Sequence, residues 1–244
     1  MRFLFTVLLF ISLALFSARA QTIKILESKP DHINLELSFA DYYSIKDKVF
    51  QDKKFIYIEK NGICLRKPGE PWIPAQFYTF GLPFNKTATC KILNLTQEKI
   101  PNVSVLPYPD SPNQPVEQSK FDPLIYTKDQ LFPPVSVKIA APFTMRYVKG
   151  SSLEVAPYQY NPISRELLFN KKILVQINFD ADPHSKVSAI LNIKDKLTED
   201  FVASMFINPA EAKGFIGKPV TMKNSNTSRI DTSRYTQPIL QKKD

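Results

Sequence analysis

The sequence predicts an all-β fold, an antiparallel β-sandwich or jelly-roll-like domain with one short helix near its carboxyl end and a flexible tail. The chain has 20 prolines, 18 phenylalanines and 10 tyrosines but only 6 glycines, a composition that suits many short strands. Apolar and polar residues alternate with period two in several runs, each bounded by Pro, Gly, Asn or Asp turn signals. Because no helical pattern separates these runs, the strands should pair antiparallel.

The first 20 residues predict a secretory signal peptide. An almost wholly apolar run at 3–16 follows a basic residue, and small residues at 18 and 20 suit signal peptidase, which would cut between Ala20 and Gln21. The apolar run is shorter than the roughly 20 residues that span a bilayer. We therefore expect a protein that is secreted or held at the cell surface, with no integral membrane segment after signal removal.

The predicted strands follow in order along the chain. The clearest alternation places Ile33, Leu35, Leu37 and Phe39 on one face. Similar runs occupy residues 55–58, 77–82, 90–95, 135–139 and 173–179. Asn161-Pro162 opens a turn in which proline presets φ, between two alternating runs, and so predicts a hairpin within residues 143–179.

One helix is expected late in the chain. Thr198 can cap its amino end, acidic residues follow in its first turn, and Leu197, Phe201 and Met205 share one face. The proline that begins residues 209–234 should prevent continuation of the helix. This polar range is expected to be a flexible tail, because it cannot bury enough apolar surface to offset the entropy of ordering.

Cys64 and Cys90 form a candidate disulfide, since two cysteines in an exported chain make an even pair. Two buried thiols are the alternative, because a core of this size does not require a covalent link. Neither cysteine is expected to be a nucleophile. The chain's two histidines, His32 and His184, lie in a strand and a loop whose context gives no support for a Cys-His pair.

The sequence supports no catalytic residue, metal site or cofactor. Neither histidine lies near a second ligand at metal-binding spacing, and no glycine-rich loop precedes a helix. Glu166, Asp180 and Asp182 are best interpreted as solvated acids at strand ends. The net charge is +9, but basic and acidic residues are interleaved rather than clustered, which argues against nucleic acid as a partner.

Several segments resemble one known family. Residues 155–162, VAPYQYNP, resemble the core of the pro-domain that precedes gingipain-like secreted cysteine peptidases. Residues 67–74, KPGEPWIP, resemble that family's KG-x-P-x-x-P segment with one extra proline, and residues 130–133, QLFP, resemble its aromatic-proline step. Residues 233–238, SRYTQP, resemble the junction at which such precursors are cut. The resemblance covers residues 26–238.

This resemblance implies a non-catalytic pro-domain over residues 21–208. In the family such a β-sandwich docks on its peptidase, keeps it latent during export and assists its folding. Arg234 and Tyr235 would flank the processing site, and residues 235–244 would be the first residues of the peptidase. The partner implied is a gingipain-like cysteine peptidase, either in cis or as the target of a free-standing inhibitor acting in trans.

The family inserts a basic residue of one loop into the specificity pocket of the peptidase. The corresponding loop here is residues 108–122, whose prolines would stiffen it and lower the entropy lost on docking. Its only cation is Lys120, whereas alignment from the amino-terminal side places Gln114 near the pocket-filling position. Both are candidates for the inhibitory residue, and an ordinary exposed lysine is the alternative interpretation of Lys120.

An extracellular binding module, such as an adhesin or glycan binder, is the alternative function. A β-sandwich presents loops that recognise glycans or partner proteins, and fold alone does not choose between these uses. Trp72, Tyr108 and Tyr126 could stack on sugars, although isolated aromatic residues more often pack within the protein.

Overall fold

The computed structural model of the chain describes residues 22–39, 44–50, 53–59, 66–111, 114–115, 118–145, 148–183 and 196–215. Its strands are β1 (Thr22–Ser28), β2 (His32–Ser38), β3 (Ser44–Phe50), β4 (Lys53–Glu59), β5 (Gln76–Gly81), β6 (Lys86–Ile100), β7 (Val137–Ile139), β8 (Phe143–Met145), β9 (Val148–Val155), β10 (Tyr158–Asn161) and β11 (Glu166–Ala181). Its helices are α2 (Pro123–Tyr126), α3 (Lys196–Met205) and α4 (Pro209–Phe215).

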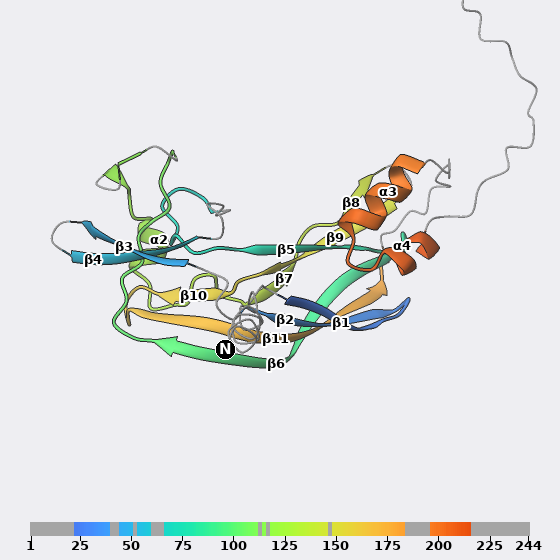
Figure 1. Cartoon of the computed structure of the whole chain (residues 1–244), viewed down its shortest axis with the longest axis horizontal. Coiled ribbons are helices and arrows are strands. Elements are labelled where there is room, and N and C mark those ends of the chain that lie inside the picture. The colour runs from blue at the N-terminus through green and yellow to red at the C-terminus, as the bar shows by residue number, and fades with distance from the viewer. Residues whose placement is uncertain are drawn as a thin grey trace, which may run out of the picture.

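The strands form two larger antiparallel sheets and one hairpin (Figure 1). In the larger sheet, the 16-residue strand β11 is central: β6 pairs along one edge, while β2 and β10 share the other edge and β1 extends the sheet beyond β2. In the second sheet β9 is central, with β5 on one edge and β7 and β8 on the other. The β3–β4 hairpin lies at one end of these layers and α3 and α4 at the opposite end. The predicted antiparallel β-fold is confirmed.

The core lies between the two larger sheets. The alternation predicted in the first strand is confirmed, because Ile33, Leu35, Leu37 and Phe39 are all fully buried. The facing and neighbouring strands add Phe80, Leu153, Val155, Ile173, Val175 and Ile177. Each such side chain stabilises the fold by about 1.5–3 kcal/mol relative to exposure, so the core depends on many similar contributions.

Buried polar side chains connect residues 130–133 and 155–162, two segments whose sequences resemble the pro-domain family. Gln159 in β10 is 3% exposed; its amide donates to the Pro133 carbonyl (2.9 Å) and accepts from the Ser136 hydroxyl (2.7 Å). Asn170 is fully buried and donates to the Ala156 carbonyl (2.7 Å). The predicted hairpin is confirmed, with β10 and β11 paired around the turn that begins at Asn161. The two recognisable segments are therefore neighbours in space.

Helix α3 is present, but the predicted cap and buried face are wrong. Thr198 lies inside the helix and is 2% exposed, so it does not cap the amino end. Val202 and Phe206 are buried with it, whereas Leu197 is 71% and Met205 51% exposed. Both sets share the spacing i, i+4, i+8, so periodicity alone could not choose between two faces one residue apart.

The prediction of a flexible tail from residue 209 is wrong for the first seven residues of that range, which form α4. Proline is tolerated in the first turn of a helix because the N–H that it lacks would have no partner there, so Pro209 begins a helix instead of ending one. Ala212 is buried, and the buried Asn208 side chain fixes the junction by exchanging two hydrogen bonds with the backbone of Gly81 (2.7 and 3.1 Å). The remainder of the predicted tail, residues 216–234, lies outside the described residues.

Candidate functional site

The 108–122 loop is anchored at both ends by one tight turn. Gly69, with φ +87°, donates its N–H to the Tyr108 carbonyl (3.0 Å), and the Tyr108 N–H donates to the Glu70 carbonyl (2.7 Å). At the other end the Asp122 N–H donates to the Gly69 carbonyl (3.1 Å). A Cβ on Gly69 would lie 3.3 Å from Asp122, and a positive φ favours glycine. The 67–74 segment therefore supports the loop, a role that sequence reasoning missed although Pro-Gly signals a turn.

Gln114 organises the interior of this loop. Its side-chain carbonyl accepts from the Asp110 N–H (2.8 Å), and its amide donates to the Gln118 carbonyl (2.8 Å). The backbone adds a turn in which the Gln114 N–H donates to the Ser111 carbonyl (3.0 Å). Both ends of the Gln114 amide are thus engaged within the loop, so this side chain braces the loop. Whether Gln114 also contacts a partner stays a prediction.

Lys120, in contrast, is exposed. It lines an open hollow of about 520 Å³ whose other walls come from the same loop: Asp110, Ser111, Gln114 and Gln118. The loop thus combines internal bracing with a single outward cation. Whether Lys120 fills a specificity pocket stays a prediction.

Aromatic packing supports the base of the loop. The Phe121 ring contacts Tyr126 (centroids 4.8 Å apart), whose hydroxyl donates to the Val105 carbonyl (3.0 Å). Burial raises the pKa of Tyr126 far above its ordinary range. Trp72 packs against Tyr108 (5.5 Å) and the aromatic ring of Tyr57 (4.5 Å). These three rings pack against other parts of the protein, which is the commoner role of isolated aromatic residues.

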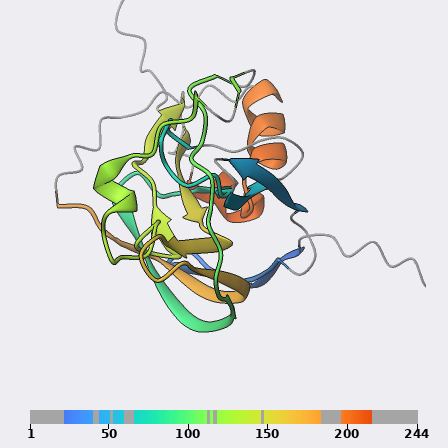
Figure 2. The ribbon, with the colours of Figure 1, turned by 90° about the vertical axis from the view of Figure 1, so that its left-hand side faces the viewer.

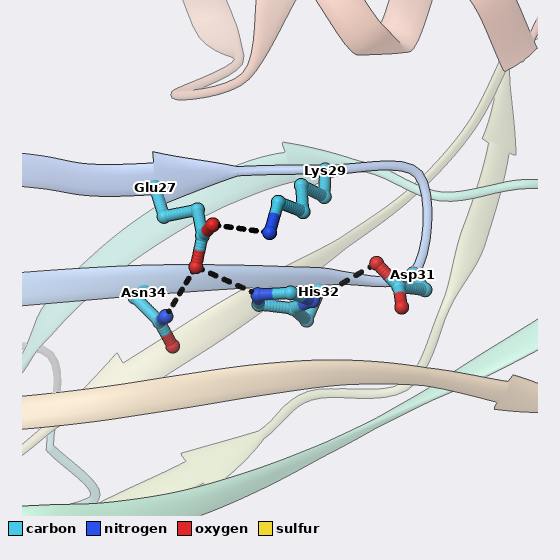
Figure 3. A network of polar contacts seen from close by, with 5 residues as sticks. All are labelled: Glu27, Lys29, Asp31, His32 and Asn34. Atoms are coloured by element: carbon cyan, nitrogen blue, oxygen red, sulfur yellow. Dashed lines mark hydrogen bonds and ion pairs between the residues drawn. The ribbon is translucent and has the colours of Figure 1, made fainter.

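A polar network fixes the β1–β2 hairpin at the edge of the larger sheet (Figure 3). The two ring nitrogens of His32 face the carboxylates of Glu27 (3.0 Å) and Asp31 (2.9 Å), and these contacts raise its pKa. Hydrogen bonds from Lys29 and then His32 lower the pKa of Glu27 to about 2, and Asn34 also donates to it (3.0 Å). A protonated His32 donates to both carboxylates, so the network ties the edge strand to β2 while His32 carries its second proton.

The described residues form no group of three His, Cys, Asp or Glu that could hold a metal, and include no helix long and apolar enough to cross a membrane. Cys90 is half-buried, and burial raises the pKa of its thiol, which disfavours a nucleophilic role. Asp180 accepts from the Thr89 hydroxyl (2.7 Å) and Glu166 pairs with Lys99, as expected of acids at a protein surface.

Three pairs of predicted sites include residues outside the described part of the chain. These are the signal cleavage site at Ala20 and Gln21, the processing site at Arg234 and Tyr235, and the disulfide partner Cys64. The pairing of Cys64 and Cys90 therefore stays a prediction.

Comparison with known proteins identifies the family. The family model Propeptide_C25 matches residues 17–208. The chain belongs to the Propeptide_C25 family. As a member of it, this chain is a non-catalytic gingipain-type propeptide, and the resemblance drawn from its sequence is confirmed.

The propeptide is also similar to curated and solved proteins. Gingipain R2 of Porphyromonas gingivalis is 31% identical over 84 residues, which is 34% of this chain and 11% of the relative, so the match spans about a tenth of the relative's length. A chain in the complex of Porphyromonas gingivalis RgpB pro- and mature domains superposes with a TM-score of 0.65 at 17% identity, covering 77% of this chain and 97% of that one. The structure on the zymogenic latency of gingipain K from the same organism gives 0.54 at 15% identity, with coverages of 68% and 97%. These structures share the fold of this propeptide.

Proposed function

We propose that this propeptide is the latency domain of a secreted gingipain-like cysteine peptidase. It binds the peptidase domain, blocks its active site, assists its folding and is released by cleavage after Arg234. Residues 1–20 direct export, and residues 235–244 begin the peptidase. A free-standing inhibitor that acts in trans on such a peptidase would use the same surface.

The braced 108–122 loop is the observation that carries this proposal. Its ends are fixed at Gly69 and Glu70, and Gln114 spans its interior. A loop that is ordered before docking loses less conformational entropy when it enters a narrow pocket. The related RgpB pro- and mature domains form a complex, which supports an equivalent docking here.

Lys120 is proposed to occupy the primary specificity pocket. It is the loop's only cation and it is exposed in the free propeptide, so it can be transferred into a partner. A lysine that meets a carboxylate inside a closed pocket gains a charge-assisted hydrogen bond, which is far stronger than an ion pair at the surface. Removal of the ammonium group would leave the pocket carboxylate without its partner.

Inhibition of mature gingipain R2 and gingipain K tests the assignment of Lys120. A Lys120→Ala propeptide should inhibit at least about tenfold more weakly, equivalent to roughly 1.4 kcal/mol. The matched control is Lys128→Ala, which removes an exposed lysine just beyond α2. An inhibition constant unchanged by Lys120→Ala would refute the assignment, and a wild-type propeptide that inhibits neither enzyme and fails to bind either would contradict the function.

Processing after Arg234 is tested by mass spectrometry. Mature gingipain R2 should release the peptide 235–244 from the wild-type chain but not from an Arg234→Gln variant. Arg229, five residues earlier, provides an internal comparison. Cleavage at Arg229 alone would contradict the proposed junction.

A further inference from the structure

The β3–β4 hairpin lies beside the 108–122 loop at one end of the molecule. Figure 1 places the two at the same end, which faces the viewer in Figure 2. The backbone joins them, because the Ile56 N–H of β4 donates to the Ser104 carbonyl (2.8 Å) and the Leu106 N–H donates to the Ile56 carbonyl (2.8 Å). From Leu106 the chain runs directly into the loop. The hairpin is therefore held next to the loop that is proposed to enter the peptidase.

Side chains on one face of β4 reinforce this connection. Phe55 packs against Phe121 near the carboxyl end of the loop, with ring centroids 6.0 Å apart. Tyr57 packs against Trp72 (4.5 Å), and Trp72 packs in turn against Tyr108 at the amino end of the loop (5.5 Å). This face of the hairpin is thus in contact with the base of the loop, and a partner that approaches the loop meets both elements.

The opposite face of the hairpin carries apolar side chains that the fold leaves exposed. Ile45 and Val49 lie on the same face of β3, because side chains alternate along a strand, and they are 46% and 70% exposed. Ile45 is paired with Ile58 of β4, which is fully buried in the main core. The apolar face therefore begins in the core and continues outward onto β3, where it is open to solvent.

The outer edge of β3 can also take a further strand. Among the described strands, β3 pairs with β4 alone. In an antiparallel pair alternate residues point their backbone N–H and C=O groups away from the partner, so β3 presents donors and acceptors along its outer edge. An extended segment can add to such an edge through main-chain hydrogen bonds, while its side chains cover the apolar residues of the edge strand.

The sequence of β3 disfavours a second copy of this chain as the added strand. Two copies of β3 related by a two-fold axis would pair antiparallel, and the registers that pair most of the strand place the axis at residue 46, 47 or 48. An axis at Asp47 puts Asp47 opposite itself and Lys46 opposite Lys48. An axis at either lysine puts that lysine opposite its own copy. Because like charges directly opposite each other are destabilising, the edge suits a strand of different sequence.

We propose that β3 accepts an extended strand of the peptidase domain, which pairs with the outer edge of β3 and covers Ile45 and Val49 with apolar side chains. This inference rests on the proposed latency function and adds a main-chain contact to the contact made by the loop. Hydrogen bonds and ring contacts hold the hairpin against the loop, so a peptidase that takes up the loop brings its surface next to β3. The second contact then forms within one complex and costs less entropy than an independent binding event.

Hydrogen exchange in the complex tests the main-chain pairing. The complex is formed with mature gingipain R2 or gingipain K, whose active-site cysteine is alkylated to prevent digestion of the chain. Mass spectrometry of residues 44–50 should show about three newly protected amides, because every second amide of this strand points away from β4. Helix α3, at the opposite end of the molecule, should exchange as in the free chain. A complex in which residues 44–50 exchange at an unchanged rate would overturn the proposal.

A pair of matched variants tests the apolar contact. Val49→Lys places a charge where the added strand would cover an apolar side chain, and should weaken inhibition about fivefold or more. Leu197→Lys makes the same kind of change on α3, at a residue that is 71% exposed, and should leave inhibition unchanged. Since both residues are exposed, the urea midpoint of each variant should equal that of the wild-type chain. An equal loss of inhibition in the two variants would show a general charge effect and overturn the site.

The same assays separate this inference from the function on which it rests. If the wild-type propeptide inhibits a mature gingipain and Val49→Lys inhibits it equally well, β3 is not a docking edge, although the latency function stands. If the wild-type propeptide neither binds nor inhibits gingipain R2 or gingipain K, the latency function fails and the docking edge fails with it.

Discussion

The internal bracing of the 108–122 loop by Gln114 can be tested without disturbing the core. Gln114→Ala removes the bond that the Asp110 N–H donates to its side chain and the bond that its amide donates to the Gln118 carbonyl, both 2.8 Å long. A typical net hydrogen bond contributes about 0.5–1.5 kcal/mol. Because Asp110 and Gln118 are exposed and can bind water instead, we expect the lower end of that range for each, about 1 kcal/mol in total.

This loss should appear as local opening rather than global unfolding. Amide hydrogen exchange at Asp110 should accelerate about fivefold, since 1 kcal/mol corresponds to that factor in an opening equilibrium. The urea midpoint should stay within error of the wild-type value, because no core residue is changed. Inhibition of a gingipain should weaken by a similar factor, as the entropy of ordering the loop is then lost on docking.

The Gln114→Glu variant should keep one of the two side-chain hydrogen bonds of Gln114 and lose the other. A glutamate can still accept from the Asp110 N–H, but its carboxylate cannot donate to the Gln118 carbonyl. Exchange at Asp110 should therefore remain slow while inhibition falls partway. Unchanged exchange at Asp110 in Gln114→Ala would refute the bracing role, and so would inhibition that is insensitive to both substitutions.

Two further predictions concern the scaffold. Asn208→Ala removes the hydrogen bonds of its side chain to the buried N–H and C=O of Gly81, and should lower the free energy of unfolding in urea by about 2–5 kcal/mol. As the control, Asn94→Ala changes an exposed residue and should alter this free energy by less than about 0.5 kcal/mol. Equal effects of the two substitutions would contradict the role of Asn208. The wild-type chain should have a higher thermal midpoint than the His32→Gln variant, and this difference should be greatest between about pH 4.5 and 6.5. It should fall as pH rises through the raised pKa of His32, and also below pH 4.5 as Glu27 is protonated towards its pKa of about 2, so a difference independent of pH would be the contrary result.

Local sequence signals were reliable where one residue type dictates one geometry. Strict alternation in β2 identified the buried face, because successive strand residues point to opposite sides of a sheet. Asn161-Pro162 located the turn of the β10–β11 hairpin for a similar reason, since proline fixes φ and the asparagine side chain accepts from the Ile163 N–H (3.0 Å). The 108–122 loop and its single cation were located by the resemblance to the pro-domain family and not by these local signals.

Signals that depend on distant neighbours were misleading or silent. Whether Leu197 or Thr198 faced the core depended on how α3 meets the sheet, and Pro209 was compatible with either the end or the start of a helix. The anchoring of the loop ends depends on contacts from Gly69, 39 positions before Tyr108 in the chain, and these follow only from the folded path.

The sequence by itself thus determined the class of fold, the family and the candidate inhibitory lysine, since alternation, turn residues and short motifs act over a few neighbouring positions. The tertiary structure decided which face of α3 is buried and that the turn at Gly69 and Glu70 holds both ends of the 108–122 loop. These outcomes depend on long-range packing and hydrogen bonding, which no short window of sequence contains.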